Sequence, residues 1–154
     1  MIRVAINGYG RIGRGFHRRT LTCSASGEKI QVVAINSRSE ADSHAYLLKR
    51  DSLYGSLDNE IEAKNGDLVV DGKVVKVLQE KNPTHINWDH LGVDIVIEST
   101  GKFTNYEDAS QHLEAGAKDV VITAPCDDPQ VQTLVMGVND KEYDPHKYQI
   151  VSNA

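Results

Sequence analysis

The stretch "INGYGRIGRG", from Ile6 to Gly15, contains four glycines and two arginines and directly follows a short apolar run. Glycine inside regular structure costs about 0.5–1 kcal/mol relative to alanine, so such a cluster predicts backbone that bends sharply or is approached closely. Gly8, Gly10 and Gly13 fit the pattern GxGxxG. In such a pattern the first glycine makes a tight turn, the second admits a pyrophosphate to the backbone, and the third lets a helix pack on the sheet.

The residues around this stretch predict a strand–helix–strand unit. Residues 1–7 and 30–36 are apolar runs typical of buried strands. Between them the apolar spacing becomes helical, with one face formed by Ile12, Phe16, Thr20 and Cys23 and another by Arg11, Arg14 and Arg18. Residues 24–27 are expected to end this helix. The unit as a whole favours dinucleotide binding over the alternative, a glycine-rich turn that serves only packing.

The rest of the chain continues this α/β rhythm. We expect helices at residues 39–49 and 106–115, and strands at 93–98, 118–123, 134–138 and 149–152. Residues 60–79 differ, because Asn65-Gly66 and Asp71-Gly72 are hairpin turn signals between alternating apolar runs. The predicted fold is therefore a Rossmann-type doubly wound, mostly parallel sheet with a small antiparallel excursion around 60–79, in one domain over residues 1–154.

Composition excludes several classes of protein. The net charge of −5 argues against a general nucleic-acid or membrane surface, and no apolar run approaches the roughly 20 residues of a membrane span. The N-terminus shows no signal-peptide pattern, and the two cysteines form no CxxC motif, so we expect a reduced, cytoplasmic protein. The six histidines are scattered, which favours surface or half-buried positions over a metal site.

The tip of the second strand bears on the choice of nucleotide. Such tips usually hold an acidic residue that binds the adenosine ribose, but this one carries Asn36, Ser37 and Arg38. Ser37 is small and neutral, and Arg38 is able to pair with a 2′-phosphate. The tip therefore favours a site that takes NAD or NADP, with a solvated Arg38 as the alternative.

A second glycine turn, Ser99-Thr100-Gly101, follows the apolar run at 93–98, and Thr123 closes the next strand. Loops at the carboxyl ends of parallel strands converge on the ligand crevice, so these residues are expected to line it. The alternative is a hydroxyl-rich turn that only starts a helix.

The motifs together resemble one enzyme family. "RVAINGYGRIGR", "VVAIN", "LLKRDSLYG", "IESTGKFT", "HLEAGAKDVVITAP", "VMGVN" and "IVSNA" follow one another along the whole chain as in phosphorylating glyceraldehyde-3-phosphate dehydrogenases. The related erythrose-4-phosphate dehydrogenases share most of these motifs and are an alternative.

The resemblance implies a set of cofactor contacts. The pyrophosphate would lie on Asn7, Gly8, Gly10, Arg11, Ile12 and Gly13. Asn36 and Ser37 would lie near the adenosine ribose, with Lys81 near the adenine. Ser99, Thr100, Gly101 and Phe103 would follow the dinucleotide toward Thr123 at the nicotinamide end.

The resemblance also implies what this chain does not carry. Ser37 replaces the family's usual NAD-selecting aspartate, as in its NADP-using, biosynthetic branch. The nucleophilic cysteine and general-base histidine belong to a catalytic half that would follow Ala154, so we expect this fragment alone to be inactive, with no catalytic residue and no metal. A homotetramer is expected for the full-length enzyme. A non-catalytic dinucleotide-binding module is the alternative, and RNA binding is disfavoured by the negative charge and by the lack of an aromatic stacking face.

Overall fold

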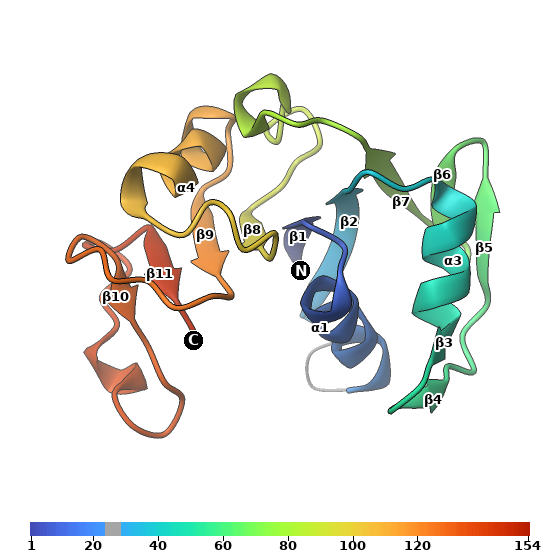
Figure 1. Ribbon diagram of the computed structural model, residues 1–154, viewed down its shortest axis with the longest axis horizontal. Coiled ribbons are helices and arrows are strands. Elements are labelled where there is room, and N and C mark those ends of the chain that lie inside the picture. Colours follow the sequence, from blue (N-terminus) through green and yellow to red (C-terminus); the bar gives the residue numbers. More distant parts are fainter. Residues whose placement is uncertain (24–28) are drawn as a thin grey trace.

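The computed structural model describes residues 1–23 and 29–154 (Figure 1). The predicted helix end at residues 24–27 lies outside these residues. The helices are α1 (Arg11–Thr22), α3 (Ala41–Lys49) and α4 (Tyr106–Glu114), with 3-10 turns η1 (Pro83–His85) and η2 (Asp140–Glu142). In the described part of the chain, none of the helices combines the length and the apolar character that a membrane crossing requires.

The centre of the molecule is a nine-stranded sheet with the order β10-β11-β9-β8-β1-β2-β7-β6-β5. Its strands from β10 to β7 pair in parallel, and β7, β6 and β5 pair antiparallel. The strands are β1 (Ile2–Asn7), β2 (Ile30–Asn36), β5 (Ile61–Lys64), β6 (Asp67–Val70), β7 (Lys73–Leu78), β8 (Ile95–Glu98), β9 (Asp119–Ile122), β10 (Gln132–Thr133) and β11 (Ile150–Ser152). A separate two-stranded ribbon joins β3 (Arg50–Asp51) to β4 (Gly55–Ser56). The predicted Rossmann-type architecture is confirmed.

The strand order reverses between β1 and β8. The chain runs outward from β1 through β2 to β7, then crosses back to β8 on the other side of β1. In open α/β sheets, ligands bind outside the carboxyl ends of the strands at this switch point. A ligand site is therefore expected at the carboxyl ends of β1, β2 and β8.

Both faces of the sheet are covered. Ile6 of β1 packs in a cluster that includes Phe16 of α1 and Leu48 of α3. The neighbouring Ala5 points to the opposite face, into a cluster with Trp88. This alternation follows from the two-residue period of a strand. Figure 1 shows α4 and α1 on opposite sides of the central strands.

The antiparallel excursion forms at the predicted place. Both hairpin turns have positive φ at their two central residues, 54° and 83° at Asn65-Gly66 and 48° and 77° at Asp71-Gly72. These are type I′ values, which match the right-handed twist of the flanking strands. The excursion joins the main sheet through β7, which pairs in parallel with β2.

One predicted strand is wrong. Residues 134–138 form a turn, and the strand at this place is the two-residue β10 just before them. Gly137 has φ +80°, and the Asn139 side chain accepts a hydrogen bond from Val135 N at 2.7 Å. A left-handed glycine and an asparagine that closes on the backbone favour a turn over the extended chain that the apolar residues suggested.

The polar and apolar faces expected for α1 also need correction. Ile12, grouped with Phe16 on the apolar face, is 59% exposed, because it lies in the first turn beside the glycine loop. Arg18, expected on the polar face, is only 5% exposed. Its guanidinium donates to Leu48 O at 2.5 Å and to Gly55 O at 2.8 Å, and these bonds offset its burial.

Three of the histidines are not at surface or half-buried positions. His17, His44 and His112 are buried, with exposed fractions of 2%, 2% and 0%. Their spacing along the sequence did not indicate this burial. Each of the three lies on a helix, and the sequence does not show which side of that helix packs against the rest of the protein. Within residues 1–23 and 29–154, no group of three or more His, Cys, Asp or Glu side chains is placed to hold a metal ion.

Candidate functional site

The three glycines of the first loop have different physical roles. Gly8 has φ +91°, and a Cβ there would lie 2.6 Å from Thr100 N. A Cβ at Gly13 would lie 2.4 Å from Gly8 O. These two glycines are required by the fold, since real Cβ atoms do not approach so closely. Among the described residues, a Cβ at Gly10 would meet no atom within 4 Å beyond its own chain neighbours.

The beginning of α1 presents free donors beside Gly10. Gly10 is the N-cap, no side chain caps it by a hydrogen bond, and the first turn holds no acidic residue. The first intrahelical bond runs from Arg14 N to Gly10 O at 3.0 Å, so the amides of Arg11, Ile12 and Gly13 have no acceptor within the helix. Such a helix start is suited to an anion.

A buried carboxylate lies under the switch point. Glu98, at the end of β8, is 1% exposed. Its Oε2 accepts from Asn7 Nδ2 at 2.6 Å and lies 2.9 Å from His112 Nε2. Its Oε1 accepts from Thr100 N at 2.8 Å and from Thr100 Oγ1. The charge is thus compensated by hydrogen-bond donors on three sides.

The hydrogen bonds continue from Asn7 across the sheet. Asn36 Nδ2 donates to Asn7 Oδ1 at 2.7 Å and to Glu80 O at 2.8 Å, while Asn36 Oδ1 accepts from Glu80 N at 2.8 Å. The backbone of Ser37 is held in turn by a bond from its N to Leu78 O at 2.9 Å. Hydrogen bonds of the asparagine side chains and of the backbone therefore connect the ends of β1, β2, β7 and β8.

The hydroxyl groups predicted to line the crevice are also used internally. Ser99 Oγ donates to Gly8 O at 2.5 Å, and Thr123 Oγ1 donates to Glu98 O at 3.1 Å. Together with the Thr100–Glu98 bonds, these contacts hold the turn after β8 against the glycine loop. Both predicted loops therefore meet at one edge of the sheet. The side-chain hydroxyls of the turn after β8 form hydrogen bonds to other protein atoms.

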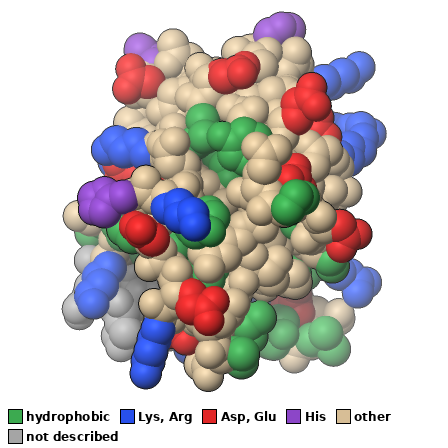
Figure 2. Space-filling view, turned by 90° about the vertical axis from the view of Figure 1, so that its left-hand side faces the viewer, with side chains coloured by type: hydrophobic (Ala, Val, Ile, Leu, Met, Phe, Trp, Pro, Cys, Tyr) green, Lys and Arg blue, Asp and Glu red, His purple; other side chains and the backbone are tan. Residues whose placement is uncertain are grey.

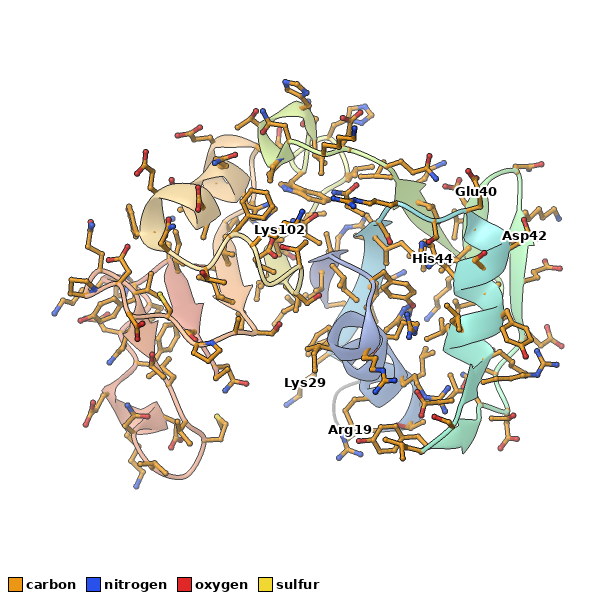
Figure 3. The ribbon with its side chains drawn as sticks, viewed as in Figure 1. Arg19, Lys29, Glu40, Asp42, His44 and Lys102 are labelled. Carbon is orange, nitrogen blue, oxygen red and sulfur yellow. The ribbon has the colours of Figure 1, made fainter. Side chains whose placement is uncertain are left out.

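The remaining predicted residues are accessible at this edge. Gly10, Arg11, Ile12, Arg38, Lys81 and Gly101 are exposed, and Ser37 and Phe103 are half-buried. The buried members of the predicted set are Asn7, Gly13 and Asn36, and Gly8 is half-buried. Glu40 and Asp42 lie at the start of α3, and Lys102 lies in the loop between β8 and α4 (Figure 3).

A second buried polar cluster lies behind the glycine loop. Tyr9 Oη lies 2.6 Å from His17 Nδ1, and the Tyr9 ring meets the His44 ring edge-on at a centroid distance of 5.2 Å. Burial lowers the pKa of His17 to about 4 and raises the pKa of Tyr9. Burial also lowers the pKa of His44, with the nearby Arg14 acting in the same direction. Figure 3 shows His44 on the side of α3 that faces the central strands.

Sequence reasoning missed the residues that organise this edge. Glu98, His112, Trp88 and Glu80 were not singled out. One signal was available for Glu98, a single acidic residue that ends the otherwise apolar run of β8 just before a glycine turn. His112 and Trp88 gave none, because only the fold brings them to Glu98.

Comparison with known proteins agrees with this geometry. Residues 2–106 match the family described as "Glyceraldehyde 3-phosphate dehydrogenase, NAD binding domain". The chain belongs to this family.

Similar proteins cover the whole chain. Glyceraldehyde-3-phosphate dehydrogenases from Geobacillus stearothermophilus and Streptomyces coelicolor are each 48% identical over 153 residues, which are 99% of this chain and 44% of those proteins. Glyceraldehyde-3-phosphate dehydrogenase 2 from Synechocystis is 46% identical over 154 residues, which are 45% of its length. The chain thus spans less than half the length of these relatives and corresponds to the NAD-binding part of the family.

Proposed function

We propose that this chain holds NAD in the crevice at the carboxyl ends of β1, β2 and β8, with the pyrophosphate against the first turn of α1. The observation that carries the proposal is the contrast among the glycines. Gly8 and Gly13 are explained by contacts within the protein, whereas the space beside Gly10 is open and adjoins free helix amides. A pyrophosphate fits that space and that set of donors.

The proposed contacts fall into two groups. The first group is accessible to a ligand and consists of Arg11, Ile12, Ser37, Arg38, Lys81, Gly101 and Phe103. In the second group the side chains form hydrogen bonds within the protein, and its members are Asn7, Asn36, Ser99, Thr100 and Thr123. We propose that the side chains of the second group determine the shape of the crevice and that the backbone atoms of these residues contact the dinucleotide. The bound cofactor would supply the hydride acceptor, and the protein would supply binding and orientation.

The Gly10→Val substitution tests the site. The Gly10 backbone has a negative φ of −81° and its Cβ would meet no protein atom, so the variant is expected to fold. The valine would fill the space of the pyrophosphate, and the affinity for NAD measured by calorimetry should fall by roughly 100-fold or more, about 2.7 kcal/mol.

A matched control is available one turn further along α1. A Cβ at Gly15 would also meet no atom of residues 1–23 and 29–154 within 4 Å beyond the helix's own backbone, so Gly15→Val makes the same change away from the crevice. This variant should bind NAD within about 3-fold of wild type. Unchanged affinity in Gly10→Val would show that the glycine loop serves packing alone.

We further propose that the site tolerates NADP. Ser37 at the tip of β2 is half-buried and uncharged, and Arg38 beside it is an exposed cation. Lys81, also exposed, follows Glu80, whose N donates to Asn36 Oδ1 at 2.8 Å. The acidic residue closest along the chain, Glu40, accepts a hydrogen bond from Gln79 Nε2 at 3.4 Å. A 2′-phosphate would thus meet positive charge here, and charge-assisted bonds would hold it.

The Ser37→Asp substitution tests this preference. A carboxylate at the strand tip would repel the 2′-phosphate and accept bonds from a ribose, so the ratio of NADP to NAD affinity should fall by roughly 10-fold or more. Ser39→Asp adds the same charge at an exposed position two residues further along the loop and should leave the ratio nearly unchanged. Equal ratios in Ser37→Asp and wild type would contradict our account of the strand tip.

The activity of the longer protein follows as a proposal. In it, this chain would serve the oxidation of glyceraldehyde 3-phosphate with inorganic phosphate to 1,3-bisphosphoglycerate, and the remaining part would supply the nucleophile and the base. We extend the expected homotetramer and the cytoplasmic location to that longer protein on the same ground, the similarity to glyceraldehyde-3-phosphate dehydrogenases along the whole of this chain.

A further inference from the structure

His112 lies away from the crevice but contacts two of the groups that form it. The residue lies on α4, and its side chain is fully buried. Its Nε2 lies 2.9 Å from Glu98 Oε2, and its ring meets the Phe103 ring edge-on, with centroids 6.1 Å apart. The indole Nε1 of Trp88 donates to His112 Nδ1 at 3.2 Å.

These contacts fix the state of the imidazole ring. An indole N–H is only a donor, so Nδ1 of His112 must act as the acceptor and carries no hydrogen. The ring is therefore neutral with its hydrogen on Nε2, and it donates that hydrogen to the Glu98 carboxylate. Trp88 thus sets the direction of the hydrogen bond on the far side of the ring.

The Glu98 side chain must accept at both oxygens. Oε2 receives donors from Asn7 and His112, and Oε1 receives the backbone N–H and the hydroxyl of Thr100. A glutamine at this position would place its NH₂ group against the donors of Asn7 and His112 in one orientation, and against the Thr100 N–H in the other. Only a carboxylate satisfies the whole set.

Two chains of contacts lead from this carboxylate to the crevice. One runs through Thr100 to the turn after β8, where Ser99 Oγ donates to Gly8 O. The other runs through Asn7 and Asn36 to the backbone of Glu80, next to Lys81. Phe103 adds a direct contact between His112 and an accessible ring.

We propose that His112 is a positioning residue for the dinucleotide: its bond to Glu98 and its contact with Phe103 set the position of the loops that hold the cofactor. The inference rests on the proposed function. It assigns a role in cofactor affinity to a fully buried side chain that acts through Glu98 and Phe103.

The test compares NAD affinity in the 154-residue chain with His112→Leu and His112→Gln. Leucine keeps apolar packing against Phe103 and removes the donor to Glu98, and affinity should fall by roughly 10-fold or more. Glutamine restores an N–H donor, and its affinity should lie between those of leucine and wild type. In spectra of the free chains, the amide resonance of Thr100 should shift in the leucine variant and move back in the glutamine variant.

Two further variants make the test specific. Glu98→Gln leaves His112 and the apolar core in place, and should weaken NAD binding as much as His112→Leu does, which keeps the inference testable if His112→Leu does not fold. His90→Leu makes the same change at an exposed histidine that lies before β8, beyond the end of that strand opposite the crevice. It should bind NAD within about 2-fold of wild type.

The outcomes separate the two proposals. If wild type binds NAD while His112→Leu and Glu98→Gln bind it equally well and leave the Thr100 resonance unmoved, the positioning role is wrong and the proposed function stands. If the folded wild-type chain itself shows no saturable NAD binding, the proposed function fails and the positioning role fails with it.

Discussion

A single methyl group distinguishes the glycines of the first loop. At Gly8 and Gly13 an added Cβ would overlap the backbone of a neighbouring segment, so these residues determine how closely β1, α1 and the turn after β8 approach. At Gly10 the same atom would enter open space. One motif of six residues therefore contains two positions that serve the fold and one that leaves room for a ligand.

His17, behind this loop, makes the fold sensitive to acid. The pKa of His17 is lowered by burial from 6.5 to about 4, so between these values the unfolded chain binds more protons than the folded chain. Stability from this residue is complete at neutral pH and is lost as the pH falls from 6.5 toward 4. The loss between pH 7 and pH 5 should be about 2 kcal/mol.

Urea unfolding of wild type and His17→Gln at pH 7 and pH 5 measures this loss. Glutamine retains an acceptor for Tyr9 Oη but does not titrate, so its free energy of unfolding should fall by about 2 kcal/mol less than that of wild type. His44 is present in both proteins and cancels in the comparison. An equal fall in the two proteins would show that His17 is not the acid-sensitive group.

Among the elements, the hairpins at β5, β6 and β7 were the most predictable. Two short signals, Asn65-Gly66 and Asp71-Gly72, determined both the turn type and the register. Alternation then placed Leu68, at 0% exposure, on the face that packs beneath α3. Local rules suffice for these strands because their partners are adjacent in sequence.

The Gly66→Ala substitution tests the contribution of one turn. Gly66 has φ +83° and open space around its Cα, so alanine would be penalised by backbone conformation alone, at about 1 kcal/mol in the free energy of unfolding. Gly15→Ala, also in open space but within α1, should instead stabilise the chain by about 0.5–1 kcal/mol. Chemical denaturation of both variants measures the difference, and equal effects would contradict the role of the left-handed turn.

Residues whose partners are distant in sequence were not predictable in the same way. The α1 pattern grouped Arg18 with Arg11 and Arg14 and did not predict its burial, because nothing in the helix reveals the carbonyl groups of Leu48 and Gly55 that accept its hydrogen bonds. The hydrogen bond between Glu98 and His112 spans two elements whose relative position the sequence leaves open. Motif and turn chemistry predicted that the loops after β1 and β8 meet at one edge of the sheet, and tertiary packing decided which of their side chains are accessible.

At the scale of the whole molecule, the fold class followed from the alternation of apolar runs and helical spacing. The reversal of strand order between β1 and β8 then brings together loops from residues 7–11, 36–38 and 98–103, which are far apart in the chain. On the face in Figure 2, cationic and anionic side chains are interspersed with apolar ones. Charges of one sign are therefore not segregated on this face.

The two margins of the sheet have a consequence for solubility in crowded solutions. A parallel sheet that stopped at β7 would leave the backbone of this six-residue strand open to pairing with other chains. The hairpins continue the sheet to β5, where Glu62 and Lys64 are exposed. The opposite margin, β10, is only two residues long. Charged or very short outermost strands hinder edge-to-edge stacking into fibrils, so the antiparallel addition protects the molecule against aggregation.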